Sequence, residues 1–254
     1  MVDVMDQETY RRFKKDFTEW SRTHAHNMLV SFPKSGRNYF GALLRRASGK
    51  IVVNGIPEVD SHPYEDLFIF ICHRGRWDIV GEHGKYILLV RDPRDAILSR
   101  TYQRSTESGI DVQNLLQDNG WLYEQNVYEW IRYFDILKPH NPLIIQYERL
   151  CLDPGKVVMQ TLDFLDVKPV ENTDAVVENY DLIKPDPHRY EEMERTSFAS
   201  GQDRYDRHCL KWQRDDYMTQ PVLDATWRIL GPLMFDYGYT ETGHADTLLS
   251  GSNE

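Results

Sequence analysis

A short segment of small and basic residues, SFPKSGRNY at positions 31–39, extends an apolar run that begins at Met28 and precedes a helical pattern. Gly36 lets the backbone approach a ligand closely, Lys34 supplies positive charge, and small neighbours expose backbone N–H groups to an oxyanion. A strand, a tight basic loop and a helix in this order can hold an anion at the helix N-terminus. The GxxxxGK[ST] pattern of ordinary nucleotide-binding loops is absent. We predict an oxyanion-binding loop; the alternative is a plain strand-to-helix turn with a surface lysine.

A second polar group follows the apolar run YILLV at 86–90. Arg91 stands at the end of this predicted strand, where open parallel sheets bind ligands. Pro93 suits the first position of a helix that Asp92 can cap, and Ser99 then shares a helix face with Asp95. An arginine and a hydroxyl directed at one point can hold a phosphate. The alternative is an ordinary solvated helix start.

These two segments resemble the two signatures by which the sulfotransferase family binds 3′-phosphoadenosine-5′-phosphosulfate (PAPS). Residues 33–39 resemble the family's 5′-phosphosulfate loop, PKSGTTW, and residues 91–99 resemble its 3′-phosphate motif. Their order and their separation of about 55 residues also match, and two motifs together are far more specific than either alone. The resemblance spans most of residues 28–238, although only short stretches carry it sharply.

The resemblance implies a role for each residue of the first segment. Lys34 would stabilise charge on the leaving phosphate oxygen, and Tyr39 stands where the family has an aromatic residue that stacks on adenine. The 5′-phosphate would be held by Ser35, Gly36, Arg37 and Asn38. Arg37 and Asn38 replace the usual Thr-Thr, but both are hydrogen-bond donors and Arg37 adds charge, so we expect anion binding to be retained.

The resemblance also assigns residues elsewhere in the chain. Arg91 and Ser99 would bind the 3′-phosphate, with Arg207 joining them from a basic stretch at 204–214. His73 follows the apolar run at 67–72 and would be the general base, since a histidine near its ordinary pKa can accept a hydroxyl proton. Tyr147, in IIQYERL at 144–150, would approach the adenine. The alternatives are surface charge for Arg207, and for Tyr147 a buried tyrosine bonded to the next helix.

The surrounding pattern predicts the elements that position these residues. Apolar runs predict buried strands at 28–32, 67–72, 86–90 and 143–146, and helical spacing predicts helices at 38–46, after Pro93, at 120–137, from Pro154, from Thr173 and at 219–238. We therefore expect an α/β fold with a P-loop-like central parallel sheet of about four or five strands and helices on both faces. Residues 1–239 would form one domain, with a helix within 1–27 that packs through Tyr10, Phe13, Phe17 and Trp20. We expect 184–206 to be a long loop or lid, and 240–254 to be a disordered tail.

Composition narrows the class of partner. A net charge of −10 argues against nucleic acid as the main partner, although a local pocket can still be basic. Three scattered cysteines indicate free thiols in a reducing compartment. No apolar run of about 18 residues or signal-peptide pattern occurs, so we expect a cytoplasmic protein without a transmembrane segment. A homodimer is compatible with the sequence.

Together these features predict a sulfotransferase that moves the sulfuryl group of PAPS to an acceptor hydroxyl, releases 3′-phosphoadenosine-5′-phosphate (PAP) and needs no metal. The acceptor would be a sugar, a glycolipid or a small alcohol, held by the segments 53–64, 101–121 and 184–206. Two alternatives remain: a P-loop-type ATP-dependent kinase, which would need Mg²⁺, and a non-catalytic module that binds PAP.

Overall fold

The computed structural model describes residues 27–54, 67–72, 84–180 and 201–244. Its centre is a five-stranded, wholly parallel sheet with the strand order β2-β3-β1-β4-β5. The strands are β1 (Asn27–Ser31), β2 (Ile51–Asn54), β3 (Leu67–Cys72), β4 (Lys85–Val90) and β5 (Leu143–Gln146). The predicted parallel sheet of four or five strands is confirmed. The sequence analysis did not predict β2, which is only four residues long.

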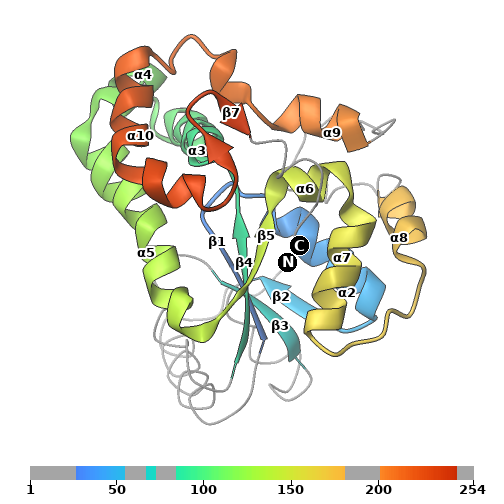
Figure 1. Cartoon of the computed structure of the whole chain (residues 1–254). Coiled ribbons are helices and arrows are strands. Elements are labelled where there is room, and N and C mark those ends of the chain that lie inside the picture. Colours follow the sequence, from blue (N-terminus) through green and yellow to red (C-terminus); the bar gives the residue numbers. More distant parts are fainter. Residues whose placement is uncertain (1–26, 55–66, 73–83, 181–200, 245–254) are drawn as a thin grey trace, which may run out of the picture.

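Helices cover both faces of the sheet (Figure 1). One face carries α3 (Pro93–Ser108), α4 (Val112–Gln117), the π-helix η3 (Gly120–Val127), α5 (Tyr128–Leu137) and α10 (Gln220–Phe235). The other carries α2 (Arg37–Ser48), α6 (Tyr147–Leu152), α7 (Pro154–Phe164), α8 (Thr173–Tyr180) and α9 (Gly201–His208). Two short 3₁₀ turns, η4 (Lys138–His140) and η5 (Lys211–Gln213), and a hairpin of β6 (Tyr239–Thr240) and β7 (Gly243–His244) complete the described chain.

The central strands are apolar because both of their faces are covered. Along β4, Tyr86, Leu88 and Val90 belong to the core on one side of the sheet, whereas Ile87 and Leu89 belong to the core on the other. All five side chains are at most 2% exposed. Successive side chains on a strand point to opposite faces, so a continuous apolar run is what a doubly covered strand requires.

Local signals fix the helix that follows β4. The Asp92 carboxylate accepts a hydrogen bond from the Arg94 backbone N–H at 2.9 Å, and Pro93 occupies the first helical position. Gly109 ends α3 with a positive φ of 71°. The same arrangement opens α7, where Asp153 accepts from the Lys156 N–H before Pro154 begins the helix. The predicted starts of α3 and α7 are confirmed.

Two predictions of irregular structure are wrong in part. Residues 201–206, expected to be loop, lie in α9, which packs on α6 through buried Tyr205 and a bond from Arg204 Nε to the Cys151 carbonyl (3.0 Å). Residues 240–244, expected to be disordered, belong to the β6–β7 hairpin. Tyr239 anchors the hairpin in the core, and residues 240–244 are held by polar contacts such as those of Arg94 with the Thr240 and Glu241 carbonyls, so no apolar periodicity could reveal them.

The expected N-terminal helix, the segment 181–200 and the tail after residue 244 lie outside the described residues. Cys151 and Cys209 are buried free thiols. No helix within the described ranges is long and apolar enough to cross a membrane.

Candidate active site at the carboxyl edge of the sheet

The segment that joins β1 to α2 has the backbone of a tight turn. Lys34 and Gly36 have φ values of 68° and 81°, both in the left-handed region, and the Ser35 N–H donates to the Phe32 carbonyl at 3.2 Å. Gly36 is the N-cap of α2, where no side chain makes a capping hydrogen bond and the first turn contains no acidic residue. The N-terminus of this 12-residue helix is therefore suited to an external anion.

Gly36 is required by its neighbour as well as by its backbone angle. A Cβ atom at this position would lie 2.1 Å from Cε2 of Tyr147, the first residue of α6. The ring of Tyr147 thus packs directly on the backbone of the loop. Two residues that the sequence analysis placed around one nucleotide, 111 positions apart (147 − 36), are in contact.

Arg91 connects the loop to the far end of the site. Its Nη1 donates to the Lys34 carbonyl at 2.6 Å, and its Nη2 donates to the His208 carbonyl at 2.5 Å. The guanidinium lies 4.7 Å from the centre of the Tyr147 ring and 3.9 Å from the Asp95 carboxylate. The two predicted anion-binding segments and the C-terminal end of α9 therefore meet at one buried arginine.

Several cationic side chains gather here, beside the Asp95 carboxylate. Burial, followed by the charges of Lys211, Arg91 and Arg207, lowers the pKa of His208 to about 4. Burial and the charge of Arg91 also lower the pKa of Lys211. For Lys34, burial and the charges of Arg37 and Arg91 lower the pKa, while Glu107 opposes this shift. Neighbouring cations destabilise one another's charged forms, so an anion bound among them would be stabilised.

Several buried polar atoms at this edge have no hydrogen-bond partner within the described residues. The hydroxyls of Ser31, at the end of β1, and of Ser35, in the loop, are fully buried and unpaired. Arg91 Nε is also buried without a partner. Unpaired buried donors are costly unless a ligand or water satisfies them. Two hydroxyls and a guanidinium N–H suit the oxygens of a phosphorylated ligand such as PAPS.

The other predicted site residues lie on α2, α3, α6 and α9. Ser99 is half-buried on α3, one turn beyond Asp95. Tyr39 is a partly buried residue of α2 that packs on the core beneath it. Arg207 is exposed on α9 and pairs with Asp203 at 3.0 Å. Burial, followed by the nearby Cys151 thiol, raises the pKa of Tyr147. The ring is buried, as the alternative expected, but its contact with Cys151 lies within α6 rather than with the next helix.

His73 lies outside the described residues. The strand before it is well placed: β3 ends at Cys72, which pairs with Val30 of β1 just before the Lys34 loop. The ends of β3 and β1 are therefore neighbours at the same edge of the sheet. No group of three or more potential metal ligands occurs in the part of the chain that the structure describes.

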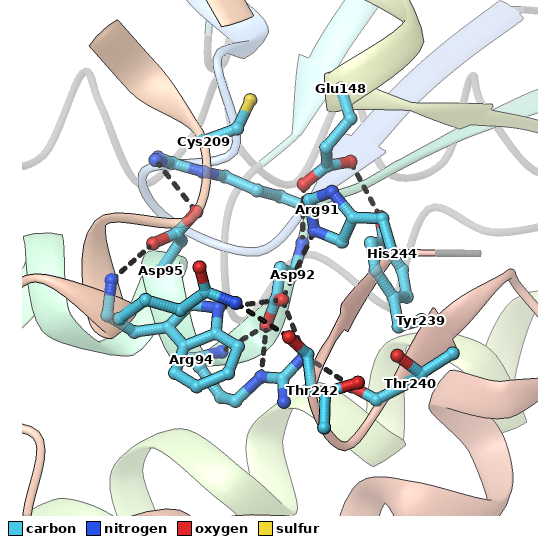
Figure 2. A network of polar contacts seen from close by, with 12 residues as sticks. Arg91, Asp92, Arg94, Asp95, Glu148, Cys209, Tyr239, Thr240, Thr242 and His244 are labelled. Carbon is cyan, nitrogen blue, oxygen red and sulfur yellow. Dashed lines mark hydrogen bonds and ion pairs between the residues drawn. The ribbon is translucent and has the colours of Figure 1, made fainter. Parts of the chain in front are cut away.

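The sequence analysis missed a buried polar network next to Arg91 (Figure 2). Asp92 accepts from Arg94 Nε and Nη2 at 2.9 and 2.8 Å, from Trp212 Nε1 at 3.1 Å, and contacts His244 Nε2 at 3.3 Å. Asp92, Arg94, Trp212 and His244 come from three separate parts of the chain. The only sequence signal is the charged stretch RDPRD at 91–95, which reads equally well as a solvated helix start.

Known proteins resemble this chain in sequence and in fold. A family model described as "Sulfotransferase domain" matches residues 73–237, about two thirds of the chain, and begins after the Lys34 loop. Among solved structures, mouse sulfotransferase SULT7A1 complexed with PAP covers 84% of this chain and 89% of its own at 16% identity and a TM-score of 0.52. A sulfotransferase from Alicyclobacillus acidocaldarius covers 76% and 100% at 15% identity and a TM-score of 0.45. A search of curated proteins finds no match.

Proposed function

Because this chain belongs to the sulfotransferase family, we propose that it transfers a sulfuryl group from PAPS to the hydroxyl of a sugar, a glycolipid or a small alcohol. The observation that carries the proposal is the position of Arg91, whose guanidinium bonds to the Lys34 loop on one side and to the end of α9 on the other. A nucleotide with a phosphate group at each end is held best by two cationic segments of the protein, one for each phosphate. The hydroxyls of Ser31 and Ser35, which have no hydrogen-bond partner among the described residues, add donors at the end of β1 and in the loop.

In this proposal the 5′-phosphate lies at the start of α2, held by Ser35, Gly36, Arg37 and Asn38. The 3′-phosphate lies against Arg91, with Ser99 and Arg207 as further donors, and Tyr39 and Tyr147 flank the adenine. Bound PAPS supplies the activated sulfuryl group. Arg91 is suited to its part because burial and a hydrogen bond to each neighbouring segment fix its guanidinium in advance.

Two side chains would act on the transferred group and the acceptor. Lys34 is exposed at the loop, and its ammonium would stabilise the negative charge that develops on the leaving phosphate oxygen. His73 would accept the proton of the acceptor hydroxyl as the oxygen bonds to sulfur. Its support is its place in the sequence directly after β3, whose end adjoins that of β1.

The kinase alternative has less support, because the loop lacks the GxxxxGK[ST] pattern. The binding-module alternative would leave Lys34 and His73 without a task. Two binding titrations and one transfer assay distinguish a sulfotransferase from the kinase and from the binding module.

Calorimetry with PAP and with ATP plus Mg²⁺ tests the nucleotide, and mass spectrometry of mixed hydroxyl acceptors incubated with PAPS tests for the gain of one sulfuryl group. We expect PAP to bind, ATP to bind far more weakly, and a sulfated product to form. His73→Ala should keep PAP affinity and lose transfer. His140→Ala is the matched control, since His140 lies on η4, away from this edge, and packs on Tyr86.

Tight ATP binding with phosphoryl transfer would favour the kinase. PAP binding with no transfer to any acceptor would favour the module. Full activity in His73→Ala would remove His73 from the proposal without affecting the nucleotide site.

A further inference from the structure

The β6–β7 hairpin returns from α10 to the carboxyl end of β4, where Arg91 lies (Figures 1 and 2). Arg94 donates from Nη2 to the Thr240 carbonyl and from Nη1 to the Glu241 carbonyl, both at 2.8 Å. The hydroxyl of Tyr239 donates to Glu148 Oε2 at 2.8 Å. A segment close to the C-terminus is thus bonded to the residues that begin α3 and α6.

Asp92 is the centre of this arrangement. Its carboxylate is fully buried and accepts from the Arg94 backbone, the Arg94 guanidinium and the Trp212 indole, and it contacts His244. Buried charges are tolerated only when they are paired and hydrogen-bonded, so each of these donors has a share in keeping Asp92 in place. Of these four groups, only His244 is a side chain of the β6–β7 hairpin.

His244 is itself held on both sides of its ring. Nε2 faces Asp92 at 3.3 Å, and Nδ1 lies 2.6 Å from the hydroxyl of Tyr205 on α9. Burial alone would lower the pKa of His244, but the hydrogen bond to Asp92 and the charges of Glu148 and Asp95 raise it. Either the cation or the neutral form with a proton on Nε2 can donate to Asp92, because the Tyr205 hydroxyl can accept from or donate to Nδ1.

Two series of polar contacts connect the Asp92 network to Arg91. The backbone N–H of Asp92, the residue next to Arg91, donates to Glu148 Oε1 at 2.9 Å, and the other oxygen of Glu148 is bonded to Tyr239 of the hairpin. Asp95 accepts from the Trp212 backbone N–H at 3.1 Å and faces the Arg91 guanidinium with its second oxygen. The residues around Arg91 are therefore bonded to the hairpin through Glu148 and Tyr239, and to η5 through Asp95 and Trp212.

We infer that His244 is a positioning residue for Arg91 and that the C-terminal hairpin is a structural part of the 3′-phosphate subsite. His244 touches no nucleotide; it holds Asp92, and the Asp92 turn orients the arginine. The inference depends on the proposed function, because it gives Arg91 the 3′-phosphate as its ligand.

The test compares His244→Leu with His244→Gln. Glutamine can place a donor near the position of Nε2, whereas leucine keeps bulk and removes the donor. We expect His244→Leu to weaken PAP affinity by about tenfold, because the Asp92 turn loses a hydrogen bond to a charged group and holds Arg91 less firmly in its binding position. His244→Gln should stay within about threefold of the parent. Affinity for adenosine 5′-monophosphate, which lacks the 3′-phosphate, should be the same in all three proteins.

The control is Leu137→Val, a core change at the end of α5, away from the Arg91 edge. It should lower the melting temperature without removing any hydrogen bond of the hairpin, so it should leave both affinities unchanged when they are measured well below that temperature. If His244→Leu does not fold, Tyr239→Phe removes only the hydroxyl that bonds Glu148 and should weaken PAP selectively, by a smaller factor.

The outcomes separate the two proposals. If the parent protein does not bind PAP, the proposed function fails and this inference fails with it. If the parent binds PAP and His244→Leu binds it equally well, only the inference is wrong. An equal loss of affinity for both nucleotides would also overturn it, since that result indicates a general loss of structure rather than a misplaced Arg91.

Discussion

Replacing Gly36 with alanine perturbs the point at which the anion-binding loop meets α6. Two independent physical effects oppose a side chain there. The backbone has a φ of 81°, and the new Cβ would lie 2.1 and 2.4 Å from two ring atoms of Tyr147. Separations below about 3 Å are not found for real Cβ atoms, so the ring has to move.

The two effects can be estimated separately. An L-residue in the left-handed region costs about 1–2 kcal/mol. Forcing an extra carbon into a filled space costs about 1–3 kcal/mol. We therefore expect Gly36→Ala to lower the free energy of unfolding by about 2–5 kcal/mol. A displaced ring would also leave the Arg91 guanidinium, which now lies 4.7 Å from its centre, so PAP affinity should fall too.

Urea unfolding of the parent protein and four variants measures these contributions. Gly109→Ala is the matched control, because Gly109 also has a positive φ (71°) but no atom of the described residues lies within 4 Å of its Cβ position. It should show the backbone cost alone, about 1–2 kcal/mol. In a Tyr147→Ala background, Gly36→Ala should likewise fall to that cost. If Gly36→Ala costs the same with and without the Tyr147 ring, the close approach is not what requires glycine.

Three further predictions follow from the same region. Asp92→Asn should lower the free energy of unfolding by about 3–5 kcal/mol in urea titrations at pH 7, because it leaves the buried Arg94 guanidinium uncompensated; a loss below about 1 kcal/mol would contradict this. Lys34→Ala should reduce kcat by about 10²–10³-fold in a sulfuryl-transfer assay, with a smaller effect on PAP affinity; an unchanged kcat would exclude Lys34 from catalysis. The pKa of His208 is lowered to about 4, so the unfolded chain binds its proton first as pH falls, and stability should drop between about pH 6.5 and pH 4. His208→Gln should reduce that drop by at most about 3 kcal/mol in unfolding curves measured across this range; identical curves would refute the assignment.

The elements that the sequence analysis predicted correctly are those in which local chemistry and tertiary packing require the same residues. The run at 86–90 is apolar throughout because β4 is covered on both faces, and the helix after it begins where Asp92 and Pro93 can cap and start it. The Lys34 loop was recognisable for the same reason. Its glycine and its basic residue are set by backbone geometry and charge within a few positions.

The two predictions that were wrong in part lie where no local pattern exists. Residues 201–206 are polar on most sides, and their helix forms because Arg204 and Tyr205 are buried against α6. His244 stands in a polar tail, yet it contacts Asp92, 152 positions earlier (244 − 92). Such contacts depend on side chains that meet only after the chain has folded.

The parallel α/β architecture, the family resemblance and the two segments that would hold a doubly phosphorylated nucleotide could be predicted from the residues alone, because each rests on patterns within single turns, strands or helices. The bonds from Arg91 to both Lys34 and His208, and those from the C-terminal hairpin to the start of α3, could be found only in the folded protein. Hydrogen bonds between buried groups depend on direction and on distances of about 3 Å, and nothing in the order of residues specifies those before the elements pack.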